Sequence, residues 1–247
     1  MDVEHAGFWY GRETMKKRFY RNVTTEADSV GHRVLLDGRT VRSPGKRECS
    51  LPSEHLATAI ATEWDSQQDE IDPVTMPLFS LAVTVIDRVT PQRADLVAEM
   101  IAYGGNDLLC YRADDDELAG RQASQWQPWL EWSDTILGAP LEVASGIMPV
   151  TQPATSLARF GAVLGQHDDW ELGVLHRAVA LGGSLVLGLA FLRGEIDHRK
   201  LFETAFLDEL WQVERWGSDF EAEDRRGFIQ GELDEIARFL SLLGAVR

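Results

Sequence analysis

RVLLDGRTVR, residues 33–42, places an Asp-Gly pair between two apolar runs. Gly38 accepts a positive φ without a Cβ clash, so Asp37-Gly38 predicts the tight type I′ turn of a β-hairpin. Arg18 to Thr24, rich in aromatic and β-branched residues, predicts a strand before the hairpin. Glu48 to Leu51 predicts a short strand after it. The chain is therefore expected to begin with strands that form a sheet.

Beyond these strands the apolar residues recur at helical spacing. Ser53 is the expected N-cap of a helix whose apolar residues fall four apart, at Leu56, Ile60 and Trp64. A second helical pattern runs from Leu78 to Val89. Thr90 and Pro91 then predict the N-cap and the first residue of a third helix, which ends near Tyr103.

The second half of the sequence is predominantly helical. Short strands are expected at Asp107–Arg112 and Leu141–Val143, with a helix containing Trp126 and Trp129 between them. From Pro153 onward the spacing predicts helices only, at residues 157–164, 170–181, 184–192, 197–216 and 219–243. Strands followed by helices, without βαβ alternation, indicate the α+β class. We expect an N-terminal β-containing domain with packed helices at residues 15–90 and a C-terminal all-helical bundle domain at residues 91–247.

The charge of the chain disfavours two classes of partner. Its 40 acidic and 24 basic residues give a formal charge of -16, which repels nucleic acid and anionic membranes. The first fifty residues are the exception, because ten Lys and Arg against seven Asp and Glu leave a charge of +3. Solvated charge without a partner explains such asymmetry as readily as a binding surface does. If the acidic part has a partner, a basic protein face is favoured.

Membrane insertion and secretion are not expected. The longest apolar stretch, Val179–Leu192, is shorter than the roughly 20 residues that span a bilayer and contains three glycines, so it predicts a buried helix pair. The N-terminus has no apolar signal-peptide core, and its early acids are unlike an organellar transit sequence. Cys49 and Cys110 lack CxxC spacing and indicate a reducing compartment. Together these features favour a bacterial cytoplasm.

Sequence motifs for cofactors and catalysis are missing. Neither GxGxxG nor GxxxxGK[ST] occurs, the six histidines show no metal-ligand spacing, and no serine lies in GxSxG. Gly182-Gly183-Ser184 suits either an anion nest or, as we favour, a tight turn between packed helices. No cofactor, metal or catalytic residue is therefore predicted. One alternative remains open: an enzyme that uses Asp208, Glu209 and Glu214 for acid–base chemistry.

Two segments combine tryptophan with charge: TEWDSQQDEIDP at residues 62–73 and LDELWQVERWGSD at residues 207–219. Each suits either a tryptophan that fills the core or a recognition surface, since Trp and Arg are enriched in interface hot spots. In a helix, Glu214 shares a side with Leu207, Leu210 and Trp211, whereas Glu209 points elsewhere. Glu214 is therefore the acid expected to be partly buried.

With DLLCYRA at 107–113, PVTQP at 149–153 and GGSLVLGLA at 182–190, these segments resemble the ATP synthase F1 assembly chaperones that bind the alpha subunit. The resemblance extends from about Lys16 to Leu243 and leaves residues 1–14 outside it. It implies a two-domain, non-enzymatic protein, with relatives in the mitochondrial matrix. Its implied role is to bind newly made F1 alpha subunit before that subunit meets the beta subunit. No nucleic acid or small-molecule substrate is implied.

The resemblance also implies site residues. The Trp-Asp motif of the family falls on Trp64 and Asp65, followed by Gln68. Its acidic C-terminal motif falls on Asp208, Glu209, Gln212, Glu214, Trp216 and Gly217. Trp64 either touches the client or locks the N-terminal sheet to its helix, and the second role is slightly favoured.

Overall fold

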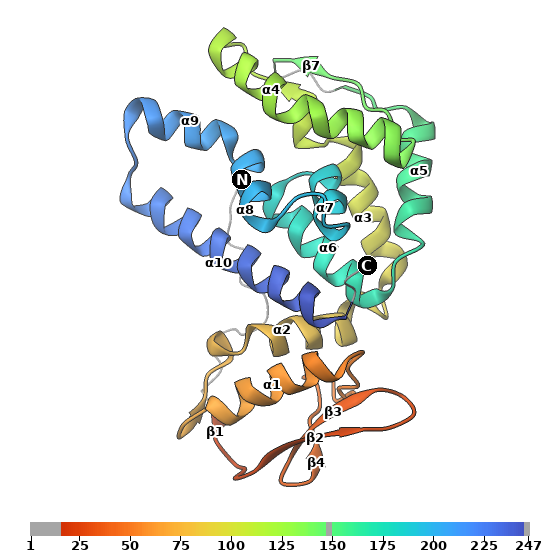
Figure 1. Ribbon diagram of the computed structural model, residues 1–247, viewed down its shortest axis with the longest axis vertical. Coiled ribbons are helices and arrows are strands. Elements are labelled where there is room, and N and C mark those ends of the chain that lie inside the picture. The colour runs from red at the N-terminus through yellow and green to blue at the C-terminus, as the bar shows by residue number, and fades with distance from the viewer. Residues whose placement is uncertain (1–15, 147–149, 245–247) are drawn as a thin grey trace. The chain divides into compact units, whose positions relative to one another are not determined.

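The computed structural model describes residues 16–146 and 150–244, which fall into two compact units. Among these residues, unit 1 contains Lys16 to Pro91 and Arg238 to Gly244, and unit 2 contains those from Gln92 to Ala237. The strands of unit 1 precede the helices of unit 2, so the α+β class is confirmed (Figure 1). The domain bounds 15–90 and 91–247 stay a proposal, and residues 1–14 lie outside the described residues.

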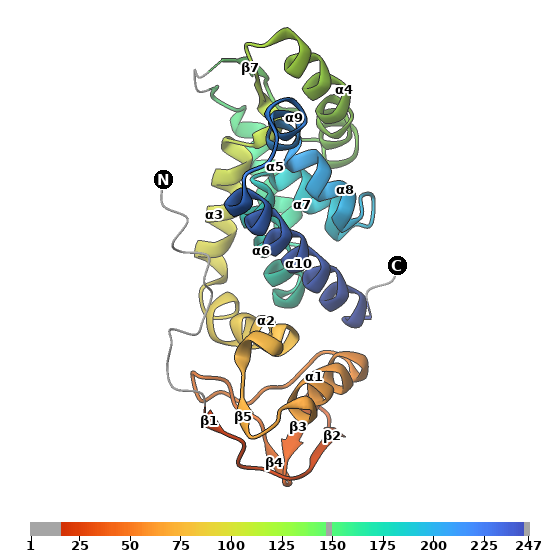
Figure 2. The same ribbon diagram turned by 90° about the vertical axis from the view of Figure 1, so that its left-hand side faces the viewer.

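Unit 1 contains a three-stranded antiparallel sheet in the order β2-β3-β4. Its strands are β2 (Val23–Ala27), β3 (His32–Leu36) and β4 (Arg39–Thr40). Asp37 and Gly38 join β3 to β4 with φ of 48° and 78°, as a type I′ turn requires. The predicted hairpin is therefore confirmed. A separate pair joins β1 (Lys16–Lys17) to β5 (Glu70–Ile71), side by side in Figure 2.

Two predicted strands of unit 1 were misplaced. The first was expected at Arg18–Thr24, but β2 begins at Val23. The Asp37 carboxylate accepts the backbone N–H groups of Arg21 and Asn22, at 3.2 and 2.9 Å, and so diverts them from strand pairing. Glu48–Leu51 was expected as a strand, but it makes only isolated bridges, from Glu48 to Arg42 and from Leu51 to His32 of β3.

The helix α1 (Glu54–Ser66) packs on β2 and β3. Ser53 caps it as predicted, since its hydroxyl accepts the backbone N–H of Leu56 at 3.1 Å. The predicted apolar side chains of α1 are buried, and each contributes about 1.5–3 kcal/mol to folding. The chain continues through the short 3₁₀ helix η1 (Pro73–Thr75), α2 (Pro77–Thr84) and the π-helical turn η2 (Val85–Val89).

Unit 2 is built of helices, with one short strand pair beside α4 at its edge (Figure 1). The parallel pair is β6 (Tyr111–Arg112) with β7 (Ala144–Ser145), and short turns are η3 (Leu108–Cys110) and η4 (Ser133–Leu137). The α-helices are α3 (Arg93–Gly105), α4 (Asp116–Trp132), α5 (Ala154–Leu164), α6 (Asp169–Gly182), α7 (Leu185–Leu192), α8 (His198–Ala205), α9 (Leu207–Trp216) and α10 (Phe220–Leu242), whose last turn belongs to unit 1.

The centre of unit 2 is the helix pair α6 and α7, as the apolar stretch predicted. Gly183 ends α6 with a φ of 68°, and the Ser184 hydroxyl caps α7 by accepting the N–H of Leu187 at 3.0 Å. A Cβ on Gly188 would lie 2.7 Å from a methyl group of Val179, so glycine is needed for this close approach. In the described part of the chain, no helix has the length and apolar character to cross a membrane.

Asp107, Cys49 and Cys110 are buried ionisable side chains that lie outside both tryptophan segments. Asp107 is fully buried and joins η3 to α7, because it accepts the backbone N–H groups of Leu109 and Val186, each at 3.1 Å. Burial raises its pKa to about 6. Cys49 and Cys110 are buried free thiols, and burial raises the pKa of each to about 12.

The predicted helix 197–216 is instead two helices, which break at Phe206. The indole N–H of Trp126 donates to the Thr204 carbonyl at 2.8 Å, an oxygen that a continuous helix would offer to Asp208. Thr90 is likewise no N-cap. Its N–H donates to Val85 in a π-type turn, and α3 begins only at Arg93.

The short strands of unit 2 also differ from prediction. Only Tyr111–Arg112 is strand, because the preceding residues form η3, which Asp107 caps. The strand expected at Leu141–Val143 lies instead at Ala144–Ser145. Both backbone groups of Glu142 bond the side chain of Gln152, at 2.8 and 3.0 Å, which removes them from strand pairing.

Candidate binding surface

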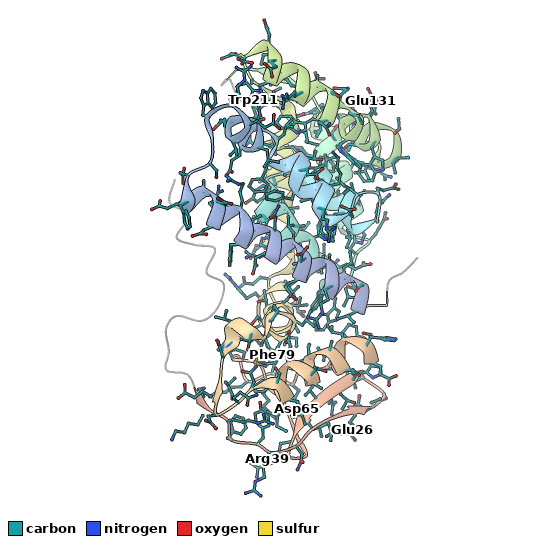
Figure 3. All side chains as sticks on the ribbon, turned by 60° about the vertical axis from the view of Figure 1, so that its left-hand side comes forward. Glu26, Arg39, Asp65, Phe79, Glu131 and Trp211 are labelled. Carbon is teal, nitrogen blue, oxygen red and sulfur yellow. The ribbon has the colours of Figure 1, made fainter. Side chains whose placement is uncertain are left out.

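Trp64 is a core residue of unit 1. It is 7% exposed and lies edge-to-face between Tyr20 and Phe79, with ring centroids at 5.7 and 4.9 Å. The hydroxyl of Tyr20 donates to the Trp64 carbonyl at 2.6 Å. Trp64 therefore joins α1 to the chain before the sheet and to α2, and whether it also touches a client stays a prediction. Phe79 is labelled in Figure 3.

Two neighbours that the sequence interpretation missed, Glu63 and Gln67, hold the same end of α1. The Glu63 carboxylate is buried and accepts the backbone N–H groups of Leu78 and Phe79, both at 2.8 Å, at the start of α2. The amide of Gln67 donates to the Glu63 carbonyl at 3.0 Å and accepts the N–H of Asp72 at 2.7 Å. Their signal was a polar residue on the apolar side of a helix, next to a tryptophan.

Asp65 and Gln68 lie on the surface of unit 1 (Asp65 is labelled in Figure 3). Arg18 donates to the Asp65 carbonyl at 3.0 Å and to its carboxylate at 3.3 Å, and it also bonds the Gln67 carbonyl. A cation at these last carbonyls stabilises the helix terminus. Gln68 bonds the Ser66 carbonyl at 2.9 Å. Asp65 is thus occupied by a helix-end contact, whereas Gln68 makes only a local bond.

The tryptophans of α9 differ in burial. Trp211 is buried, whereas Trp216, at the end of α9, is 70% exposed. The two rings meet edge-to-face with centroids 5.4 Å apart. Gly217 then ends the helix with a φ of 84°. An indole with this exposure is unusual for a soluble surface and suits a contact with another molecule.

Charged side chains connect α9 to α4. Arg121 donates to Glu214 at 2.6 Å and to Glu117 at 3.3 Å, and hydrogen bonding to Glu214 is the main cause that raises the pKa of Arg121. Glu117 also pairs with Arg215, whose guanidinium lies 4.6 Å from the Trp211 ring centre. The pairs are exposed, so they contribute less to folding than the buried rings do.

Glu209, and not Glu214, is the partly buried acid. The Glu209 side chain is 26% exposed and pairs with Arg225 and Arg226 of α10 at 3.2 and 2.9 Å. The Glu214 side chain is 59% exposed, so the expected burial was wrong. After the helix break at Phe206, α9 contacts α4, and Glu214 pairs there with Arg121 at the surface. Helical spacing along one segment does not predict such a contact between distant helices.

The acids of α9 do not converge on one point. Asp208 accepts from the buried amide of Gln122 at 2.8 Å, Glu209 holds the α10 arginines, and Glu214 holds Arg121. Each carboxylate thus faces a different partner, and the arrangement suits surface recognition better than acid–base chemistry. Over the described residues, no cluster of three or more His, Cys, Asp and Glu could hold a metal ion.

The structure thus divides the predicted site residues into two groups in separate units. We call the exposed residues Gln212, Glu214 and Trp216 the α9 surface. Asp208 and Glu209 do not belong to this surface: Asp208 links α9 to α4, and Glu209 links α9 to α10. The client-contacting role of all these residues stays a prediction.

Comparisons with known proteins agree on one family. Residues 17–134 match the family described as ATP12 chaperone protein. Protein atp12, mitochondrial, from Schizosaccharomyces pombe is 26% identical over 215 residues, which cover 82% of this chain and 74% of that protein.

Two solved structures have a higher sequence identity to this chain. Atp12 from Paracoccus denitrificans is 41% identical with a TM-score of 0.88, covering 92% of this chain and 98% of that one. The Atu1473 protein from Agrobacterium tumefaciens is 35% identical with a TM-score of 0.85, covering 94% and 86%. The chain belongs to the ATP12 chaperone family, which confirms its resemblance to the assembly chaperones of the F1 ATP synthase.

Proposed function

We propose that this chain binds the unassembled alpha subunit of the F1 ATP synthase and holds it until the beta subunit arrives. A subunit that awaits assembly exposes an apolar interface, and such patches aggregate. Covering that interface needs binding and release, but no catalysis. The expected compartment is the bacterial cytoplasm.

Membership of the ATP12 chaperone family is the observation that carries the proposal. The α9 surface adds chemistry to it. Trp216 offers a large exposed ring, with Glu214 two residues before it and Asp219 in the following loop. Aromatic anchors supply affinity, while complementary charge speeds encounter with a basic partner. The predicted complex is therefore transient and weakened by salt.

Co-purification tests the proposal. The tagged full chain is co-expressed with alpha or beta subunit separately, and we expect selective recovery of alpha. Trp216→Ala and Glu214→Lys should lower that recovery while both variants remain folded, because neither side chain is buried. Phe19→Ala, which removes an equally exposed ring from unit 1, is the matched control and should bind normally.

Equal recovery of alpha and beta, or of neither, would contradict the proposal. A second measurement uses purified beta subunit, which should displace the chain from a preformed complex with alpha. Glu209→Lys is a poor probe of binding, because Glu209 holds two arginines of α10 and its loss alters the fold.

A further inference from the structure

The first two-thirds of α10 carries a second exposed aromatic surface, which the predicted site does not include. Phe220 is 81% exposed and Phe228 is 56% exposed. The opposite side of the same helix carries the buried residues Ile229, Leu233 and Ile236. α10 is therefore apolar on both sides, although only one side has a partner within the described residues.

Four residues on the exposed side follow a straight line. Phe220, Asp224, Gly227 and Gly231 are spaced by four, three and four residues, the spacing of a seam between two packed helices. Phe228 lies beside the two glycines, since it follows Asp224 by four residues and precedes Gly231 by three. We call these five residues the outer face of α10.

The helix itself does not require glycine at Gly227 or Gly231. Both lie inside the helix, where glycine is a poor helix former, and an added Cβ on either would meet no atom within 4 Å. They neither end the helix nor relieve a clash. Beside Phe228 the helix carries no side chain at these two positions, so the large side chains of another helix could pack against its backbone. Gly120 of α4 is also exposed and unobstructed, but no second glycine and no exposed Phe accompanies it.

Charge decides what can occupy the outer face. Arg225 and Arg226 both turn to Glu209, and within the described residues no cation forms a salt bridge with Asp224. Glu221 and Glu223, in the same first turns, are exposed too. A second copy of this chain would bring the same acids and a net charge of -16 to the contact, which is repulsive. A partner with Lys or Arg is attracted.

We propose that the outer face of α10 docks a basic amphipathic helix of the bound subunit. Apolar side chains of that helix pack over Gly227 and Gly231 between the two phenylalanines, and a Lys or Arg pairs with Asp224. This inference rests on the proposed function and extends it, because it adds to the α9 surface a contact between two helices with a defined partner chemistry.

Side chains added at the two glycines test the proposal without weakening the helix. In the full chain, Gly227→Leu/Gly231→Leu should leave the melting temperature unchanged or higher, because leucine is a better helix former than glycine. The same double variant should bind purified alpha subunit at least ten-fold more weakly. Phe228→Ala should also weaken binding, and Asp224→Lys should remove part of its salt dependence.

Matched controls are Gly120→Leu for the filled glycines and Phe19→Ala for the lost ring, and both should bind as the unmodified chain does. If the unmodified chain binds alpha and the double leucine variant binds equally well, the docking face is wrong and the proposed function stands. If the unmodified chain binds no alpha, the proposed function itself fails. A dimer of the unmodified chain that the leucines abolish would identify a second copy as the occupant and overturn the proposal.

Discussion

The two tryptophan-and-acid segments look alike in sequence but differ in structure. At the end of α1, Trp64 is enclosed by aromatic rings, and its acidic neighbour Glu63 is buried against the start of α2. At the end of α9, Trp216 is largely exposed, and its acidic neighbour Glu214 pairs with Arg121 on the surface. Both segments have the same kinds of residue at similar spacing.

The two segments differ in which parts of the chain pack against them. The α1 segment is followed by a return of the chain, which supplies backbone N–H groups to Glu63 and a ring to Trp64. The helix α9 ends at Gly217, and the chain continues into α10, which carries further exposed rings. Family motifs of one composition can therefore maintain the fold in one place and leave a surface available for binding in another.

The largest expected effect is the loss of Trp64. Trp64→Ala should lower the free energy of unfolding by about 3–5 kcal/mol, because it leaves a cavity among packed rings. Trp216→Ala should change it by less than about 0.5 kcal/mol, since that ring is already in water. Denaturant unfolding of both variants measures the contrast, and similar losses would break the comparison.

The next effect concerns a buried acid of unit 2 and depends on pH. Burial raises the pKa of Asp107 from 3.8 to about 6, so the folded chain holds this proton more tightly than the unfolded chain. Its contribution to stability is therefore fully present below about pH 4 and is lost as the pH rises through about 6, by about 3 kcal/mol in total.

Asp107→Asn should remove that pH dependence. We would compare the free energy of unfolding of both chains at several values between about pH 4 and pH 7. The difference should shift in favour of the variant as the pH rises. A constant difference across this range would show that the Asp107 carboxyl is already ionised at the lower end.

A smaller effect separates the two acids of α9. Glu209→Ala should destabilise unit 2 by about 1.5–3 kcal/mol, because it leaves the largely buried Arg226 without its carboxylate. Glu214→Ala should have little effect on unfolding, since its pair with Arg121 is exposed. Thermal melts of the two variants decide this, and the reverse order would restore the interpretation from helical spacing.

Local signals in the sequence predicted most of the fold. Asp37-Gly38 specified its hairpin, Ser53 and Ser184 capped their helices, and the apolar stretch around Gly188 formed the expected helix pair. Each of these depends on residues within a few positions of one another. Local signals of this kind predict the backbone correctly wherever no distant contact overrides them.

Other features depend on contacts between distant segments. The break at Phe206 is associated with the indole of Trp126, and Arg18 reaches the end of α1 from nearly fifty residues away. The burial of Glu209 depends on the arginines of α10. A periodic pattern has no information about these partners, so it could not show which acid of α9 faces solvent.

The burial of Cys49 and Cys110 has a practical consequence for locating the client. With pKa values of about 12, both thiols are almost fully protonated at neutral pH, and only a thiolate reacts readily. A cysteine introduced at Gln212 or Asp224 would then be the one readily labelled thiol on an otherwise unaltered chain. Crosslinkers attached there could report which client residues lie over α9 and which over α10.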